Sequence, residues 1–254
     1  MIWGYFLDFG VSTLALHPAP LNITLEYLEG LGINYCEIIN EYPLDRIQED
    51  LISSYSLKFI VHAPISDVNI ASPNKRIRRS SIMEIKSSLD LAAHLDSDKL
   101  ILHPGSVPFL ARAYKDKIIG YNLQSLKELK KYADDLGVTL CLENMPKMEG
   151  YLYNNLKELQ KLVEELEIMA TLDIGHAHTM GYTTKDIRIE LVGHIHLSDN
   201  DGLKDSHNAL GTGSINFPEL FKNLRGYNGI LTIEVKSKKE LIESLTFLKK
   251  LNLL

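Results

Sequence analysis

The chain has 254 residues, of which 45% are hydrophobic and 24% are charged, and it carries a net charge of −6. This length is enough for one large buried core, and the composition is ordinary for a soluble globular protein. The negative balance excludes a global basic field, so we expect no membrane attraction and no strong general affinity for nucleic acid.

Short β-rich runs alternate with longer amphipathic segments along the whole chain. In the longer segments apolar residues recur at helical spacing, with Lys and Glu on the remaining face. Asn22 and Ser237 are expected to cap two of the helices. Strands are predicted at residues 9–16, 35–40, 58–62, 99–103, 138–143, 169–174, 192–198 and 229–235. The predicted helices include residues 44–55, 76–94, 123–136, 156–166 and 239–250.

This alternation predicts parallel strands joined by right-handed crossovers. Eight such units in a row favour a closed (β/α)₈ barrel over an open sheet, and the chain length is close to the roughly 250 residues typical of that barrel. No G-x-G-x-x-G motif follows the first strand, which disfavours the nucleotide-binding alternative. We therefore expect an α/β protein with a single TIM-barrel domain over residues 1–254.

The two cysteines, Cys36 and Cys141, both lie in apolar, strand-like runs. This usage excludes a disulfide framework and suits a reducing cytoplasm. The first ten residues lack the basic region and the cleavage site of a signal peptide. No apolar run approaches the roughly 20 residues that a membrane helix needs. We expect a cytoplasmic protein with no membrane partner.

Polar residues lie at the ends of the predicted strands in a pattern that an ordinary core does not generate. In a barrel of parallel strands the C-terminal ends meet on one face, where enzymes of this architecture place their active sites. Six strands would each deliver a metal-capable group there, so we expect a metal site at the C-terminal face of the strands. These groups are His62, His103, Glu143, Asp173, His196 and Glu234.

Charge gives the physical reason for a metal. Three carboxylates in one mouth, those of Glu143, Asp173 and Glu234, would repel one another and resist ionisation unless cations lay between them. The histidines among them favour Zn²⁺, Mn²⁺ or Fe²⁺ over purely oxygen-bound Mg²⁺ or Ca²⁺. The longest irregular stretch, residues 199–216, adds Asp205 and His207, whose spacing lets both reach one ion. A loop of this length in a compact domain usually has a function.

Each of these residues also has a purely structural alternative. A single histidine at a strand end is more often a hydrogen-bonded core or rim residue than a ligand. His194 is interpreted as a residue that packs in the core or orients a ligand. Asn144, Asp199 and Asn200 are expected either to orient ligands or to form turns.

Seven segments at these strand ends form a set of motifs. They are Val61-His62, His103-Pro104-Gly105, Leu142-Glu143-Asn144, Asp173-Ile174-Gly175-His176-Ala177, His196-Leu197-Ser198-Asp199, Asp205-Ser206-His207 and Ile233-Glu234. Together they resemble the xylose isomerase-like barrels and, within that superfamily, are similar to the endonuclease IV type of AP endonuclease. The resemblance runs from the third predicted strand to the C-terminus.

The resemblance implies a site with up to three divalent ions, with zinc favoured and manganese or iron as alternatives. All nine ligand positions of that family are filled by the expected residue type. The first ion would take His62, His103 and Glu143, the second Glu143, Asp173, His196 and Glu234, and the third His176, Asp205 and His207.

Two departures from the endonuclease branch argue against the opening of DNA. Ile65 stands where that branch has an aromatic residue, and the segment Glu41-Tyr42-Pro43-Leu44-Asp45 replaces its basic loop after the second strand. Glu37 on the second strand is more similar to the sugar isomerase and epimerase branch. So is the run from His194 through Gly213, which resembles sugar phosphate isomerases and epimerases.

Two catalytic functions follow, both with Glu143 and Glu234 as catalytic residues. The favoured prediction is a metal-dependent hydrolase that cleaves a phosphoester, either abasic-site DNA or a small phosphoester, because this function uses all nine ligands. The alternative is isomerisation or epimerisation of a sugar or sugar phosphate, in which one ion is bound and Glu143 and Glu234 move protons. A metal-binding barrel without catalysis is the third interpretation.

Overall fold

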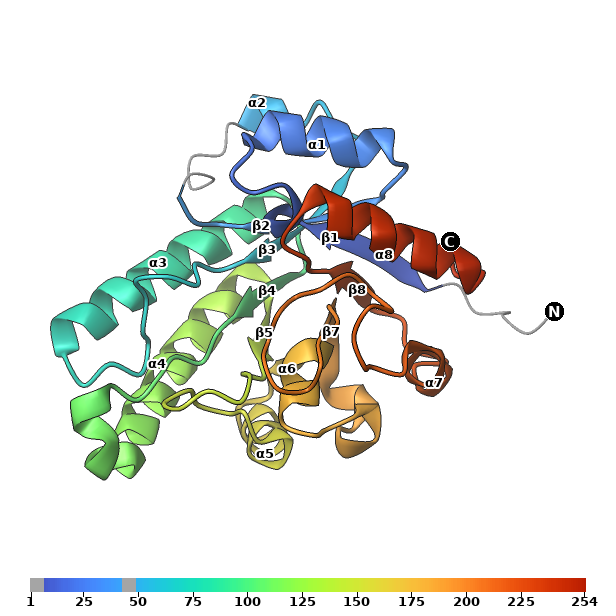
Figure 1. Cartoon of the computed structure of the whole chain (residues 1–254). Helices are drawn as coiled ribbons and strands as arrows, with labels where there is room; N and C mark the ends of the chain where they lie inside the picture. Colours follow the sequence, from blue (N-terminus) through green and yellow to red (C-terminus); the bar gives the residue numbers. More distant parts are fainter. Residues whose placement is uncertain (1–6, 43–48) are drawn as a thin grey trace.

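Eight parallel strands close into a barrel in the computed structural model, which describes residues 7–42 and 49–254 (Figure 1). Strands that follow one another along the chain pair with one another, and β1 closes the barrel by pairing with β8. The predicted (β/α)₈ barrel is confirmed. The strands are β1 (Asp8–Ser12), β2 (Tyr35–Ile39), β3 (Lys58–His62), β4 (Lys99–Leu102), β5 (Thr139–Glu143), β6 (Met169–Asp173), β7 (Val192–Leu197) and β8 (Ile230–Ile233).

Helices follow the strands in turn and surround the barrel (Figure 1). They are α1 (Leu21–Gly30), α2 (Glu49–Ile52), α3 (Lys75–His94), α4 (Lys115–Leu136), α5 (Leu156–Leu166), α6 (Ile174–Thr179), α7 (Phe217–Asn223) and α8 (Lys238–Lys250). Four 3-10 helices lie among them: η1 (Thr13–Leu16), η2 (Phe109–Tyr114), η3 (Thr184–Asp186) and η4 (Ile189–Leu191).

The helices form where apolar spacing and capping agree. In α5, Leu159, Val163 and Leu166 are buried at helical spacing, so one face packs on the barrel. The Asn155 side chain caps the same helix by accepting a hydrogen bond from Lys157 N at 2.9 Å. The predicted cap at Ser237 is confirmed, because its hydroxyl accepts from Glu240 N at 3.2 Å.

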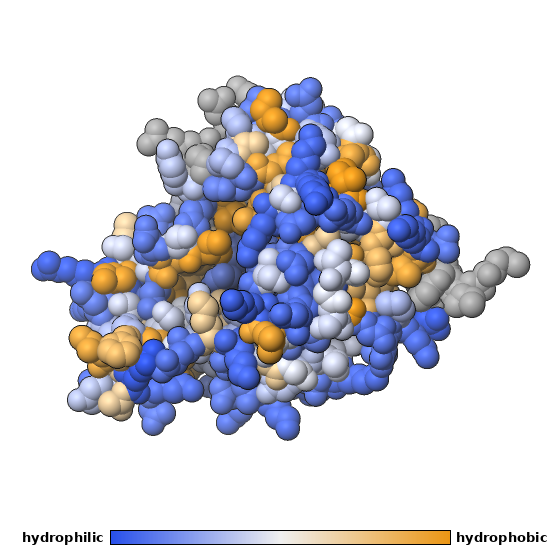
Figure 2. All heavy atoms as spheres, viewed as in Figure 1, coloured by the Kyte–Doolittle hydropathy of each residue, from blue (hydrophilic) through white to orange (hydrophobic). Residues whose placement is uncertain are grey.

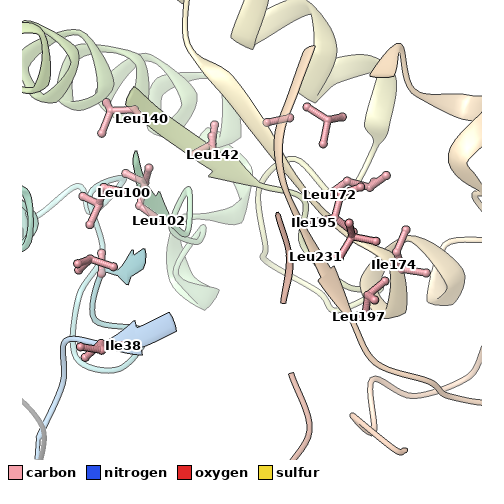
Figure 3. Close-up of a cluster of buried hydrophobic side chains, with 14 of the residues drawn as sticks. Ile38, Leu100, Leu102, Leu140, Leu142, Leu172, Ile174, Ile195, Leu197 and Leu231 are labelled. Carbon is pink, nitrogen blue, oxygen red and sulfur yellow. The ribbon is translucent and has the colours of Figure 1, made fainter. Parts of the chain in front are cut away.

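Alternation along each strand separates the apolar core from the polar mouth. Leu172 and Ile195 belong to the large apolar cluster that includes residues of the surrounding helices (Figure 3). Their chain neighbours Asp173 and His196 therefore face the barrel interior, since successive side chains on a strand point to opposite sides. The two residues are also in register on β6 and β7, so they lie at the same level.

A small apolar layer lies beneath the polar mouth. It is formed by Ile60, Ile101 and Cys141, which are buried and contact one another inside the barrel. Each stands two residues before a predicted ligand, so the ligand points inward one layer higher. This layering gives the polar groups a rigid apolar floor.

Three local predictions are wrong. β1 ends at Ser12 and the chain turns into η1, because the Ser12 hydroxyl accepts a hydrogen bond from Leu14 N at 3.2 Å. Asn22 is not a cap, since α1 begins at Leu21 directly after Pro20. The fourth helix begins at Lys115, eight residues before the predicted start at 123.

Part of one predicted helix lies outside the described residues. Residues 44–48 of the predicted helix 44–55 fall there, and α2 covers only Glu49–Ile52 of the remainder. Apart from β1, the strands agree with their predicted limits to within two residues. Across residues 7–42 and 49–254, no helix combines the length and apolarity that a membrane crossing requires.

Candidate active site

A cavity of about 570 Å³ opens at the C-terminal ends of the strands. Hydrophilic residues gather over the centre of the face that Figure 2 shows, where Figure 1 places the loop after β7. The walls of the cavity include six of the nine predicted ligands: His103, Glu143, His176, Asp205, His207 and Glu234. The other three, His62, Asp173 and His196, are buried beneath them.

The carboxylate of Glu143 lies among four histidines. Its Oε2 is 3.2 Å from His62 Nε2 and 3.4 Å from His103 Nε2. Its Oε1 is 3.2 Å from His176 Nδ1 and 3.6 Å from His196 Nδ1. Burial raises the pKa of Glu143, but the charges of His196 and His103 outweigh burial and hold this pKa well below its ordinary value. Glu143 is therefore an ionised carboxylate that joins two groups of ligands.

His196 presents one ring nitrogen to the mouth and the other to a buried carboxylate. Its Nε2 lies 3.1 Å from Glu37 Oε2, with which it forms a hydrogen bond. Its Nδ1 lies 3.8 Å from Asp173 Oδ2 and 3.4 Å from Glu234 Oε2. The hydrogen bond at Nε2 thus leaves Nδ1 to face the carboxylates of the mouth.

Two buried polar atoms at this point fit a bound cation. Within the described ranges, neither His196 Nδ1 nor Asp173 Oδ2 has a hydrogen-bond partner. A buried polar atom without a partner costs about 1–3 kcal/mol. Ligand atoms of Glu143, Asp173 and His196 all lie within 4.8 Å of one another, so one divalent ion between them would satisfy both atoms. The donor set of two carboxylates and one imidazole suits such an ion.

A second group of metal-capable residues lies beside the first. Asp205 Oδ2 is 3.2 Å from His176 Nε2 and 2.9 Å from His207 Nε2. His176 Nδ1 lies 2.8 Å from the carbonyl oxygen of Asn144, and His207 Nδ1 lies 2.9 Å from that of Glu234. These backbone contacts fix the rings with Nε2 toward Asp205.

The pKa values of two residues at the mouth are raised. Burial raises the pKa of Asp173 to about 7, and the charges of Glu143 and Asp205 act in the same direction. Burial lowers the pKa of His196, but the charges of Glu37 and other carboxylates outweigh it and raise that pKa well above its ordinary value. Protons on Asp173 and His196 would therefore compete with a cation for these two side chains.

Asn144, Asp199 and Asn200 hold the loops of the site through the backbone. Asn144 accepts from Asp173 N at 2.8 Å and donates to the Asp173 carbonyl oxygen at 3.0 Å, which links β5 to β6. Asn200 Nδ2 donates to the carbonyl oxygen of Gly175 at 2.9 Å. The sequence left open whether these residues orient ligands or form turns. Their contacts with the backbone support a role in holding the local chain.

Asp199 organises the loop after β7. Its carboxylate accepts hydrogen bonds from the backbone N–H of Asn200, Gly211, Gly213 and Ile215, at 2.8–3.2 Å. Gly213 is required here, because a Cβ at this position would lie 2.4 Å from both Asn200 O and Asp199 Oδ1. The loop that carries Asp205 and His207 is thus held in one shape.

Glu37 is a site residue that the sequence did not place at the mouth. Its Oε2 also lies 2.8 Å from Nε2 of His194, and the side chains of Glu37, His194 and His196 are fully buried. Burial raises the pKa of Glu37, but the charge of His196 and the close contact with His194 outweigh burial and hold this pKa well below its ordinary value. The available signal was a glutamate within a buried strand. Lys147, Lys204 and Lys236, which line the cavity, were missed as well.

The structure brings together the groups that the sequence proposed as ligands. Three clusters of metal-capable atoms coincide with the three predicted sets, and Glu234 lies beside the central one. A fourth cluster, unforeseen, consists of Glu37, His194 and His196. The identity of the ion (zinc, manganese or iron) and the maximum of three bound ions stay predictions.

Comparison with known proteins gives a family match. A family model described as "Xylose isomerase-like TIM barrel" matches residues 25–251. An uncharacterized protein of Methanocaldococcus jannaschii, MJ1311, is 33% identical over 97% of this chain and 90% of its own length. Fructoselysine 3-epimerase of Escherichia coli O157:H7 is 24% identical over 73% of this chain and 70% of its own length.

Solved structures with the same fold include several epimerases. A D-tagatose 3-epimerase-like protein has a TM-score of 0.86 and 32% identity, covering 96% of each chain. D-psicose 3-epimerase of Clostridium cellulolyticum H10, solved with D-tagatose, has a TM-score of 0.78 and 20% identity, covering 96% of this chain and 98% of its own. The IOLI protein, solved with a zinc atom, has a TM-score of 0.79 and 20% identity, covering 97% of this chain and 96% of its own.

The prediction of a metal-dependent hydrolase is contradicted by these findings. The relatives and structures above whose names state an activity are epimerases. The prediction depended on the presence of all nine groups, yet residues of these types can also bind substrate hydroxyls, so their number does not identify the reaction.

Abasic-site DNA as a partner is not supported either. The carboxylate of Glu41 accepts hydrogen bonds from Ile65 N at 3.0 Å and Ser66 N at 3.1 Å. Ile65 lines the cavity, so these bonds fix an acidic group beside it. An acidic group at this position would repel the phosphate backbone of a nucleic acid.

Proposed function

Since the chain belongs to the xylose isomerase-like TIM barrel family, we propose that it is a divalent-metal-dependent sugar epimerase that acts at the carbon next to a ketone. The observation that carries this proposal is the position of two glutamates around one histidine nitrogen. Glu143 Oε1 lies 3.6 Å and Glu234 Oε2 lies 3.4 Å from His196 Nδ1. Glu143 ends β5 and Glu234 directly follows β8, so the two carboxylates reach the same point from the ends of separate strands.

The ion would be held by Glu143, Asp173, His196 and Glu234. Glu37 keeps the ring of His196 in the orientation that binding needs, because it accepts the hydrogen bond at Nε2. When bound, a divalent cation polarises the carbonyl of the substrate and makes the neighbouring C–H more acidic.

The two glutamates divide the proton transfers between them. One carboxylate removes the proton from the carbon next to the ketone, and the other returns a proton to the opposite face, which inverts the configuration. The ionised state of Glu143 suits the removal of a proton. Glu234, whose Oε2 lies 3.4 Å from the same nitrogen of His196, is then the acid that returns a proton.

The size of the cavity and the names of similar proteins support a small sugar. A volume of about 570 Å³ is within the usual range of small-molecule sites. Fructoselysine 3-epimerase and the D-tagatose 3-epimerase-like protein are both named for carbon 3 of a ketose, so we assign the reaction to that carbon.

The test is to incubate the metal-loaded protein with D-fructose, D-psicose, D-tagatose and their phosphate esters, and to separate the products by chromatography. The proposal predicts the 3-epimer of at least one of them. Glu234→Gln should lower the rate by ~10²–10⁴, whereas Glu243→Gln on the exposed side of α8 should not change it. The absence of any epimer with every ketose and each of Mn²⁺, Zn²⁺ and Fe²⁺ would contradict the proposal.

A further inference from the structure

Three lysines line the cavity that contains the carboxylates. Lys147 follows β5, Lys204 follows β7 and Lys236 follows β8, and all three line the same cavity as Glu143 and Glu234. Their side chains are exposed, whereas Glu143 is buried. The cavity therefore has an acidic floor and three lysines at its rim, whereas Glu41 lines a neighbouring pocket.

The backbone holds these lysines in defined places. Lys147 N donates to Thr179 Oγ1 at 2.8 Å, which ties the loop after β5 to α6. Lys204 N lies 3.3 Å from Asp201 Oδ1 within a turn. Lys236 stands between the buried Val235 and Ser237, the cap of α8. The ammonium groups thus extend from anchored positions close in sequence to the predicted ligands.

The three ammonium groups are available to an anion. Across residues 7–42 and 49–254, none of them forms an ion pair with a carboxylate, although Lys204 interacts electrostatically with the exposed Asp201. Other lysines of the protein do form such pairs, for example Lys86 with Glu128 at 2.6 Å. Lysine binds phosphate as a point charge, and three lysines around one cavity match a group with about two negative charges.

We propose, on the basis of the proposed function, that the substrate is a ketose phosphate whose phosphate lies among Lys147, Lys204 and Lys236. Its carbonyl end then faces Glu143 and Glu234 at the floor. The similar proteins named above are named for unphosphorylated ketoses or for fructoselysine, so this proposal separates the chain from them.

The experiment compares D-fructose with D-fructose 6-phosphate, and D-ribulose with D-ribulose 5-phosphate, on the metal-loaded protein. The KM for each phosphate ester should be at least about tenfold lower than the KM for its parent sugar. Replacing each lysine by Gln should raise the KM for the ester by about tenfold, with a smaller change in kcat, so that the preference for the ester is lost. Lys239→Gln, on the exposed face of α8, is the matched control and should leave the preference unchanged.

Calorimetric binding of the same four sugars separates this proposal from the proposed function. The esters could bind, and bind more weakly to the lysine variants, while no epimer forms. This result would support the phosphate site and contradict the epimerase. Epimer formation with equal KM for ester and parent sugar, unchanged in the lysine variants, would overturn the phosphate site alone. Loss of ester binding in Lys239→Gln to the same extent as in Lys236→Gln would also overturn it.

Discussion

The Oε2 atom of Glu37 lies 3.1 Å from Nε2 of His196, and both side chains are fully buried inside the barrel. An imidazole that donates one N–H to a carboxylate presents the other nitrogen as a lone pair, and the carboxylate also makes that nitrogen a stronger ligand. In the proposed site Glu37 would therefore position His196, and it is not among the residues that line the cavity.

Glu37→Gln should weaken metal binding by about 10–100-fold, the usual cost of losing such a partner. The glutamine has nearly the same shape, so the barrel should remain folded. Metal affinity is measured by competition with a chelator, and circular dichroism reports the fold. Glu26→Gln on the exposed face of α1 is the control. A Glu37→Gln protein with wild-type affinity would refute the positioning role.

Metal binding should strengthen as the pH rises. Burial raises the pKa of Asp173, one of the four proposed ligands, to about 7, and the charges of Glu143 and Asp205 act in the same direction. A raised pKa stabilises the fold fully below the ordinary value of 3.8, and this contribution is lost as the pH rises through about 7. Over the same interval the proton that competes with the cation is lost.

The thermal shift caused by the ion should therefore grow across an interval centred on about pH 7. Differential scanning calorimetry with and without Mn²⁺ or Zn²⁺ measures it. Binding should also release protons, which appears as a dependence of the calorimetric enthalpy on the buffer. A shift that stays constant or falls over this interval would show that protons do not occupy the ligand positions.

The strand-end residues could be predicted because the architecture itself brings them together. The alternation of side chains along a strand and the order of the strands can be predicted from the sequence. Asp173 and His196 could therefore be placed on one face of the barrel without the structure. Glu37 could not be placed in this way, because it lies 159 residues from His196 in the sequence and reaches it across the barrel. Only side-chain packing in three dimensions shows that contact.

The reaction was harder to predict than the site. The same carboxylates and imidazoles suit phosphoester hydrolysis and sugar epimerisation, since both need cations and proton transfers. Counting ligands therefore favoured the wrong alternative. The one capping error had a local cause: Asn22 is a good capping residue, but Pro20 already precedes the helix, which starts at Leu21.

Asp199→Ala should loosen the loop after β7. The carboxylate accepts four backbone N–H groups, and each one left buried without a partner costs about 1–3 kcal/mol. We expect a loss of at least ~2 kcal/mol in the free energy of unfolding, measured with urea, and weaker metal binding. Asp201→Ala, at an exposed turn of the same loop, is the matched control and should cost much less. Equal losses in the two variants would contradict the role given to Asp199.

The double variant His176→Ala with His207→Ala separates the four-residue site from its surroundings. Neither histidine is among the four residues proposed to hold the ion, so the variant should retain measurable epimerase activity. Glu143→Gln should lower kcat by ~10²–10⁴, since it removes a proton acceptor and a ligand. Steady-state kinetics at saturating metal compares them. A double variant as inactive as Glu143→Gln would show that the reaction needs both clusters.

The most direct test of the epimerase mechanism is the exchange of the carbon-bound hydrogen with solvent. Metal-loaded protein and a ketose that it converts are incubated in D₂O and followed by ¹H NMR. Transfer of protons by Glu143 and Glu234 predicts one deuterium at carbon 3 of the product. Glu234→Gln should form little of this product, because it lacks the group that returns a proton to the opposite face. Formation of the 3-epimer with its original hydrogen still at carbon 3 would contradict the account.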